Sequence, residues 1–490
     1  MRREHVLRLE DGFLRTHRTT IRELDQALRG SRGPRLISVA YLFGGFILTY
    51  LARRHVTVTE VAEFFQHEAK EFDLRLFADY GSRKGKRGRH FKPSVSQLYR
   101  VKTALCHSLT DSAASSQPVA RIQALIGSDA TDGLLDGLCR MLLEGTWPVV
   151  AANGRVAVDT SLIDAHAKPI SQARIEAGDR ASDPDARHRI LTPEHGVTKR
   201  YFGYGYQAIC TCGPGHEYII ALAVNPANAN DRPVAASLVR RLKESGVPVD
   251  RVLMDRGFSD SARLLNQLRG MGCHPVFDLK SNQDRRSPDW RGNLVLDGRP
   301  YLRTLPNRLR YLPMPGVQRP EAEFRVWRKA IAERDRYGFL PNGKGSPTSI
   351  RLQSPLFRNR GFACPKVEGS IRRWDEDSPV CDGNHAADEG CAVANGTWKA
   401  QYAPRTFQFP FWGSPDWVDE FGMRSSIERS FNLMKNRDVI GLRPGEFRLR
   451  GIANMTLLLG LAAVAVNLHL QGRSAPEMSE SSRAPVPKVA

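Results

Sequence analysis

Three acidic residues stand in sequence contexts that suit metal-dependent chemistry. Asp159 and Asp255 each end or interrupt a short apolar, β-branched run typical of a buried strand, whereas Glu428 lies in a segment with helical spacing. Arg424 lies four residues before Glu428 and Lys435 seven residues after it, so one α-helix would place all three on one face. Two Mg²⁺ ions held about 3.5–4 Å apart by carboxylates are a common device for phosphodiester chemistry. The pattern predicts metal-dependent cutting and joining of nucleic acid.

Each acid also has a plain structural interpretation. Asp159 could be a strand-edge acid in a turn, Asp255 an acid at a helix entry, and Glu428 a surface acid paired with the arginine one turn away. Taken singly, these interpretations would be preferred, but their joint occurrence favours catalysis. Asp164 and Asp260 are nearby acids that an interpretation based on one motif could choose instead.

The charge balance favours a polyanionic partner. The 490 residues include 72 Lys or Arg and 52 Asp or Glu, which gives a net charge of +20 and a pI near 9.9. Nucleic acid is the first expectation for such an excess, and an anionic membrane the weaker one. The length suits roughly two to four domains.

Two apolar stretches, 37–52 and 455–470, are shorter than the roughly 20 residues that a membrane-spanning helix needs. We therefore predict that both are buried core helices and expect no membrane role. The first 22 residues are charged throughout, so we expect no secretory signal. Eight cysteines without such a leader favour a reducing cytoplasm over a disulfide framework.

Residues 1–125 are predicted to form a helical, basic DNA-binding region. Thr57 and Glu60 have capping-box spacing before an apolar run, and Ser94 and Gln97 repeat the signal. Between them, 83–92 contains six Lys or Arg in ten residues. Two capped helices around a basic arm could form a helix-turn-helix-like DNA reader, and a helical bundle with a solvated basic loop is the alternative.

An α/β catalytic core with a mixed sheet is predicted over 145–284 and 416–470. Asp255 follows a strand within a strand–helix–strand unit, and the carboxyl ends of such strands usually hold the ligand. Residues 285–415 are rich in Pro, Gly, Arg and aromatics without a helical period, which indicates a β-rich insertion. The Ser-, Pro- and Glu-rich tail 472–490 is predicted to be disordered.

Four potential zinc ligands, Cys364, Cys381, His385 and Cys391, fall within 28 residues of the insertion. Thiolates and imidazole can build a tetrahedral Zn²⁺ site, although the spacing lacks a Cys-x₂-Cys knuckle. The segment therefore holds either a structural Zn²⁺ site or four unrelated residues.

The C-terminal acidic motif resembles that of DDE transposases of bacterial insertion sequences, a group with a ribonuclease-H-like core. The group's motif runs Tyr, two residues, Arg, three residues, Glu, six residues, Lys. Here the same spacing reads Phe421, Arg424, Glu428 and Lys435, with Phe where Tyr is usual.

Two further motifs carry the resemblance in the expected order. Asp255-Arg-Gly-Phe matches the second motif, and Asp159-Thr-Ser-Leu-Ile the first. Asp255 and Glu428 are 173 residues apart, and members of the group often carry a β-strand insertion there. The resemblance covers about two thirds of the chain, over 145–470.

The resemblance implies a ribonuclease-H-like fold and an Asp159/Asp255/Glu428 triad that holds two Mg²⁺ ions, with Mn²⁺ as a substitute. It implies double-stranded DNA partners, namely terminal inverted repeats and target DNA, and a homodimer or larger assembly in the synaptic complex. Arg424 and Lys435 would contact DNA phosphate, or else form a salt bridge to Glu428 and a solvated lysine. A bacterial, cytoplasmic and nucleoid-associated protein is expected.

Three functions fit these residues. The first is an insertion-sequence transposase that cleaves 3′ ends and transfers strands, and the second a metal-dependent, structure-specific nuclease on the same fold. The third is a captured, inactive copy that only binds DNA, and the intact triad disfavours it. Five aromatics in 407–417 could contact an unstacked base, but core packing is preferred.

Overall fold

The structure is a computed structural model that describes residues 3–28, 36–52, 56–69, 76–77, 80, 91–110, 133–148, 153–179, 181–191, 198–213, 217–280, 285–315, 320–357, 393–436, 438–442 and 449–481. The chain divides into two compact units. Unit 1 comprises Met1–Asn153, Asp159–Leu238 and Ser426–Ala490, and unit 2 comprises Gly154–Val158 and Val239–Ser425. Strand β1 (Gly154–Asp164) contributes residues to both.

The N-terminal part of unit 1 is helical. Thr57 caps α4, since its side-chain oxygen accepts from the Glu60 N–H at 3.1 Å. The Ser94 N–H donates to Gln97 Oε1 at 2.9 Å, so both predicted caps form. Residues 83–90 of the basic arm lie outside the described residues. The helices are α1 (Arg3–Leu9), α2 (Arg18–Leu28), α3 (Val39–Leu51), α4 (Val58–Glu63) and α6 (Val95–Thr110), with π-helical turns η1 (Glu10–Leu14) and η2 (Phe64–Glu68).

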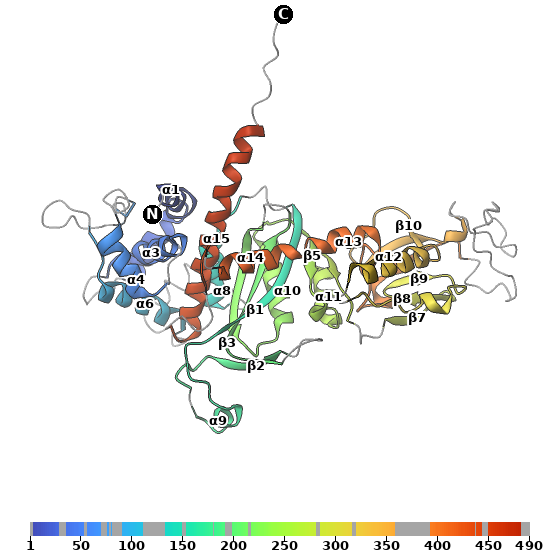
Figure 1. The fold of residues 1–490 in the computed structure, drawn as a ribbon, viewed down its shortest axis with the longest axis horizontal. Helices are drawn as coiled ribbons and strands as arrows, with labels where there is room; N and C mark the ends of the chain where they lie inside the picture. Colours follow the sequence, from blue (N-terminus) through green and yellow to red (C-terminus); the bar gives the residue numbers. More distant parts are fainter. Residues whose placement is uncertain are drawn as a thin grey trace, which may run out of the picture. The chain divides into compact units, whose positions relative to one another are not determined.

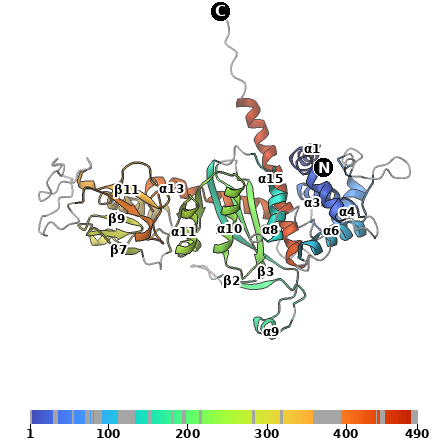
Figure 2. The same ribbon diagram turned by 180° about the vertical axis from the view of Figure 1, so that it is seen from behind.

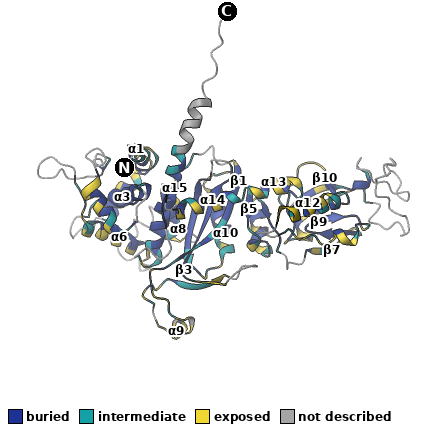
Figure 3. Cartoon of the chain, in the orientation of Figure 1, coloured by how far each residue is buried: buried dark blue, intermediate teal, exposed yellow. Residues whose placement is uncertain are grey.

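Both predicted apolar helices lie in the core of unit 1. Every residue of α3 is buried, and α15 (Ile452–Ser481) packs against α3, α8 (Leu134–Leu143) and strand β4 (Figure 1). Within the part of the chain that the structure describes, Ile452–Gly472 is long and apolar enough to cross a membrane, but 83% of its most apolar window is buried inside the protein. Figure 3 shows this part of α15 as buried, as expected of a core helix.

Helix α15 overlaps the start of the segment predicted to be disordered. Helix α15 continues to Ser481, well into the segment 472–490. Residues 482–490 lie outside the described residues.

Three strands of unit 1 form an antiparallel group. Strand β3 (Lys199–Thr211) pairs antiparallel with β2 (Arg187–Leu191) and with β4 (Ile219–Pro226). Strand β1 is also a neighbour of β3 in the sheet. Asn467 of α15 is fully buried and joins the helix to this group. Its Oδ1 accepts from the Ile219 N–H at 2.9 Å, and its Nδ2 donates to the Ile219 carbonyl at 2.8 Å and to Thr146 Oγ1 at 3.0 Å. The short helix α9 (Gln172–Glu176) lies between β1 and β2 in the chain.

Unit 2 contains a parallel group of strands. The first half of β1 pairs with β5 (Val249–Met254), and β5 pairs with β6 (His274–Phe277). Val158 is the register partner of Met254, which is in turn the partner of Phe277. A 3₁₀ turn η5 (Arg256–Phe258) and helix α11 (Ala262–Gly270) connect β5 to β6, as the predicted strand–helix–strand unit requires. Helix α10 (Asp231–Glu244) precedes β5.

The segment 285–415 contains two three-stranded antiparallel sheets in its described part, as the β-rich prediction requires (Figure 2). It also contains a 15-residue helix, α12 (Glu321–Asp335), which the prediction of no helical period missed. Trp327, Ile331 and Arg334 form the buried face of α12. One of these three is charged, so the apolar period that reveals a buried helix is incomplete. The strands are β7 (Arg286–Trp290), β8 (Asn293–Leu296), β9 (Arg299–Tyr301), β10 (Leu340–Pro341), β11 (Ser349–Gln353) and β12 (Asn395–Lys399).

The aromatic segment 407–417 packs into the core of unit 2 and leads into α13 (Pro415–Gly422). Phe407, Phe411, Trp412 and Trp417 are all less than 5% exposed. The core-packing interpretation is therefore confirmed for these four side chains. Helix α14 (Ser425–Lys435) follows α13.

We predict that Asn467→Leu destabilises the protein by about 3 kcal/mol. The leucine fills a similar volume but leaves the Ile219 N–H and carbonyl buried without partners, and each such group costs about 1–3 kcal/mol. Urea unfolding measures the change. Asn432→Ala, at an exposed position of α14, is the matched control and should change stability by less than about 0.5 kcal/mol. Equal stability of Asn467→Leu and wild type would contradict a stabilising role for the hydrogen bonds between Asn467 and Ile219.

Candidate functional site

Asp159 lies within β1, on the strand face that it shares with Ser161. Its Oδ1 accepts a hydrogen bond from the Thr160 N–H at 2.7 Å. Alternate strand residues point to the same face, so Asp159 and Ser161 project together, whereas Thr160 projects to the other side. There Thr160 Oγ1 accepts from Gln207 Nε2 of β3 at 3.0 Å. This hydrogen bond fixes the orientation of β1 in unit 1.

Helix α14 reaches the Asp159 face of β1 through Lys435. The ammonium of Lys435 donates to Ser161 Oγ at 2.5 Å and lies 6.0 Å from the ring centroid of Tyr206 on β3. Tyr206 is fully buried, and burial raises the pKa of its hydroxyl, so the hydroxyl stays protonated. Its ring also makes an edge contact with Phe431 at 5.3 Å. The last two turns of α14 therefore pack on β1 and β3 (Figure 1).

The middle of α14 is fixed to the start of β4. Arg429 Nε donates to Glu217 Oε1 at 2.8 Å, and Ser430 Oγ donates to the Glu217 carbonyl at 2.7 Å. Glu428 is exposed in the first turn, where a negative charge interacts favourably with the helix dipole. Glu428 and Lys435 are seven residues apart, so they share one face of the helix.

Arg424 does not belong to that helix. Helix α14 begins at Ser425, and the Arg424 N–H closes a turn onto the Phe421 carbonyl at 2.9 Å. The guanidinium of Arg424 lies 5.7 Å from the Phe421 ring centroid, and Phe421 stacks on Trp417 at 4.7 Å. The prediction of one helical face for Arg424, Glu428 and Lys435 therefore holds only for the last two.

Two effects shift the pKa of Lys435 in opposite directions. Partial burial lowers the pKa of its ammonium, and the carboxylate of Asp159 acts in the opposite direction. Lys435 donates to the Ser161 hydroxyl and interacts with the charge of Asp159, so its positive charge could also attract an incoming anion.

Asp255 lies in unit 2, at the carboxyl end of β5. Its Oδ1 accepts from the Arg256 N–H at 2.7 Å, so Asp255 caps the 3₁₀ turn η5. The last register pair of β1 and β5 is Val158 with Met254, and the next residue of each strand is an aspartate, Asp159 or Asp255. The same holds for β6, since Asp278 follows Phe277, the partner of Met254.

The structure places Asp159, Glu428 and Lys435 in unit 1, and Asp255 and Arg424 in unit 2. Among the residues that the structure describes, no group of three or more His, Cys, Asp or Glu side chains is gathered as a metal site. The donor chemistry nevertheless fits a hard divalent cation, because carboxylate oxygens are the ligands that Mg²⁺ prefers. The predicted zinc ligands Cys364, Cys381, His385 and Cys391 lie outside the described residues.

The sequence interpretation missed Ser161, Tyr206 and Asp278. Ser161 carried a usable signal, because it lies two residues after Asp159 in the same strand. Asp278 carried one too, since it follows an apolar strand as Asp255 does. Tyr206 gave no signal, because its place beside Lys435 depends on packing between segments more than 200 residues apart.

Comparison with known proteins gives one family match. The family model described as "Transposase DDE domain" matches residues 154–468. A comparison with curated proteins found no match. Among solved structures, a cryo-EM structure of the piggyBac transposase synaptic complex with hairpin DNA is 12% identical, with a TM-score of 0.36 over 99% of this chain and 83% of that chain. At that TM-score, the likeness carries no conclusion about this chain.

We predict that Lys435→Met changes stability in a pH-dependent way. The pKa of Lys435 is lowered in the folded protein from its ordinary value of 10.5, so the unfolded chain binds more protons between the two values. The free energy of unfolding of the wild type should therefore rise, relative to Lys435→Met, as the pH approaches about 10.5.

Urea unfolding at several alkaline pH values measures this difference. Lys199→Met, at an exposed position of β3, is the matched control for the loss of a lysine. The assigned environment of Lys435 would be contradicted if the free energy of unfolding of the wild type fell, relative to that of Lys435→Met, as the pH rises.

Proposed function

Because this chain belongs to the transposase DDE-domain family, we propose that it binds the terminal inverted repeats of a mobile element, cleaves the DNA at the 3′ ends and joins those ends to target DNA. The family membership supports a transposase, and the residues described above support the individual roles. The mechanism proposed for them is metal-dependent phosphodiester chemistry at Asp159, Asp255 and Glu428.

The register of β1 and β5 carries the proposal. Val158 and Met254 are partners in neighbouring parallel strands, and both strands continue with an aspartate. Neighbouring strands lie about 4.8 Å apart, so we infer that the carboxylates of Asp159 and Asp255 can share a cation. Strands β2, β3 and β4 are antiparallel and β1, β5 and β6 parallel, which supports a ribonuclease-H-like core.

Glu428 is the proposed third ligand. Helix α14 is held on β1 by the Lys435–Ser161 hydrogen bond, and at Glu217, two residues before β4, by Arg429 and Ser430. Two turns of helix separate Lys435 from Glu428, a rise of about 10 Å along the helix axis. Glu428 therefore lies on the same face of α14 as the lysine that reaches the Asp159 strand.

Asp159, Asp255 and Glu428 would hold two Mg²⁺ ions, or Mn²⁺ in their place. Bound metal supplies a lowered pKa for the attacking water or 3′-hydroxyl and stabilises charge on the leaving 3′-oxygen. The carboxylates would orient the reacting groups, and bound cations would relieve the repulsion between them. Lys435 and Arg424 would hold DNA phosphate oxygens, Lys435 as a point charge and Arg424 through two parallel hydrogen bonds.

The remaining parts of the chain fit a DNA-processing enzyme. The net charge of +20 favours a polyanionic substrate. The N-terminal helices and the basic segment 83–92 are the proposed region for recognition of the terminal repeats. Because two element ends must be brought together before joining, a homodimer or larger assembly is the proposed working form.

We predict that Asp159→Asn, Asp255→Asn and Glu428→Gln each lower the cleavage rate by about 10³-fold or more, because each loses several kcal/mol of metal-mediated stabilisation. The assay uses a labelled duplex carrying the element's terminal repeat, with Mg²⁺ or Mn²⁺. Binding to the same duplex should persist in all three variants. Asp164→Asn, at the last residue of β1, is the matched control and should cleave normally.

The products separate the candidate functions. Joining of a pre-cut 3′ end by wild type, lost in the three variants, supports the transposase. Cutting without joining would indicate the structure-specific nuclease. Binding without either reaction in wild type would indicate a captured DNA-binding copy, and full activity in Asp255→Asn would contradict the proposed mechanism.

A further inference from the structure

Asp278 is a second carboxylate at the strand edge of unit 2 that carries Asp255. Met254 and Phe277 are register partners in parallel strands, and each is followed directly by an aspartate. The loops after the two strands are also joined, since Lys280 and Asp260 form an ion pair at 2.8 Å. Asp278 therefore lies at the same edge as Asp255, one strand further along.

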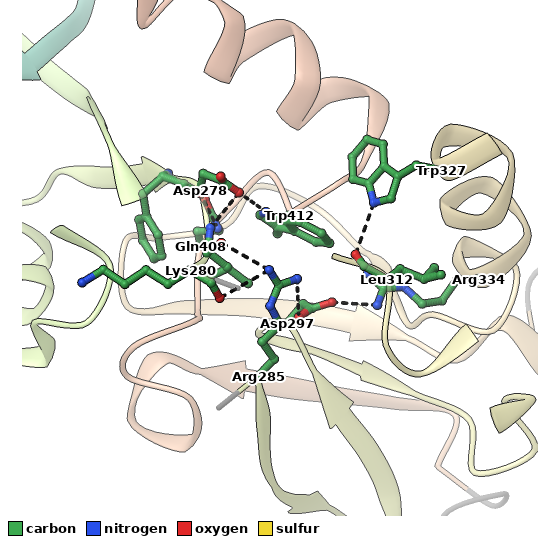
Figure 4. A network of polar contacts seen from close by, with 11 residues as sticks. Asp278, Lys280, Arg285, Asp297, Leu312, Trp327, Arg334, Gln408 and Trp412 are labelled. Atoms are coloured by element: carbon green, nitrogen blue, oxygen red, sulfur yellow. Dashed lines mark hydrogen bonds and ion pairs between the residues drawn. The ribbon is translucent and has the colours of Figure 1, made fainter. Parts of the chain in front are cut away.

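Unlike Asp255, Asp278 is buried, with only 7% of its surface exposed. Its Oδ1 accepts two hydrogen bonds, from the Leu279 N–H at 2.8 Å and from the indole N–H of Trp412 at 3.0 Å (Figure 4). Burial raises the pKa of this carboxyl, whereas the two hydrogen bonds and the charges of Arg256 and Arg285 act against that rise. A carboxylate buried at such a cost needs fixed partners, and these partners are donors and cations.

Gln408 fixes the segment that supplies Trp412. Its Oε1 accepts from the Phe277 N–H at 3.0 Å, and its Nε2 donates to the Phe277 carbonyl at 3.0 Å, as a neighbouring strand would. The indole N–H of Trp417 donates to the same Oε1 at 3.1 Å. The end of β6 is thus bonded on both sides of Phe277 to the segment before α13.

Trp412 connects Asp278 to buried charges of the insertion. The guanidinium of Arg285 lies 4.7 Å from the Trp412 ring centroid, within cation–π distance. A guanidinium nitrogen of Arg285 lies 3.6 Å from Asp297 Oδ1, and Asp297 Oδ2 accepts a hydrogen bond from the Arg334 guanidinium of α12 at 2.7 Å. Figure 4 shows the side chains of this group, with its hydrogen bonds and ion pairs as dashed lines. Asp297 and Arg334 are less than 5% exposed.

We infer that Asp278 is a positioning residue for the metal-binding edge at Asp255, held in place by Trp412 of the insertion and, through Trp412, by the buried charges next to α12. This inference rests on the proposed function of Asp255. Asp278 carries a buried carboxyl at the same strand edge as Asp255, one strand away. A negative charge at that distance favours a cation at the edge, and a neutral amide at position 278 would remove this contribution.

The inference gives the insertion a role in the chemistry of the core. Loss of the Trp412 indole N–H and loss of the Asp278 charge should both lower the metal affinity of the strand edge at Asp255. Partners of metal ligands commonly change metal affinity by about 10–100-fold when they are substituted. Asp278→Asn keeps an oxygen acceptor for Trp412 and removes only the charge, so it tests electrostatic positioning with the least disturbance of packing.

The experiment measures Mn²⁺ binding to the full-length protein by electron paramagnetic resonance, without DNA. Asp278→Asn should bind Mn²⁺ about 10-fold more weakly than wild type, and Trp412→Phe should shift in the same direction. Asp289→Asn, an exposed acid of the same unit that pairs with Arg303, is the matched control and should bind as wild type does. In the cleavage assay, excess Mn²⁺ should restore the rate of Asp278→Asn but not of Asp255→Asn.

The outcomes are distinguishable from failure of the proposed function. Wild-type Mn²⁺ affinity in Asp278→Asn would overturn the inference while leaving the triad intact. A lower thermal midpoint with unchanged affinity per folded molecule would also overturn it, because Asp278 would then serve only the fold. Normal Mn²⁺ affinity in Asp255→Asn would instead overturn the proposed function on which the inference rests.

Discussion

The parallel register between β1 and β5 is the constraint on which the proposed site depends. A slip of one residue would turn every side chain of one strand to the other face and would separate the two aspartates. Val156, Val158, Val252 and Met254 are all at most 1% exposed, so a slip would also expose this core. The apolar part of each strand thus specifies the register, and the acidic residue that ends it is placed as a consequence.

The third acidic residue depends on a different kind of contact. Helix α14 is placed on the strands of unit 1 by polar bonds at its middle and its end, through Glu217 and Ser161. Lys435 is partly desolvated in that position, which disfavours its charged form.

Sequence patterns predicted the parts of this structure that depend on local chemistry. The capped helices after Thr57 and Ser94, the buried helices and the strand that precedes Asp255 follow from capping, length and apolar runs. The family motifs indicated the three acids before any contact was known. Helix α12 was missed because Arg334 occupies its buried face, and a charged residue hides the helical period. The bond between Asp278 and Trp412 joins residues 134 positions apart, and local patterns contain no information on such pairs.

The central claim is that Asp159, Asp255 and Glu428 together hold divalent metal. Cleavage of the protein by Fe²⁺ with ascorbate and peroxide tests it most directly, because Fe²⁺ bound in place of Mg²⁺ cuts the backbone close to the ion. Mass spectrometry of the fragments should show cuts near all three residues, suppressed by excess Mg²⁺ and lost in Asp255→Asn. Cuts confined to one of the three segments, or unaffected by Mg²⁺, would contradict a shared metal site.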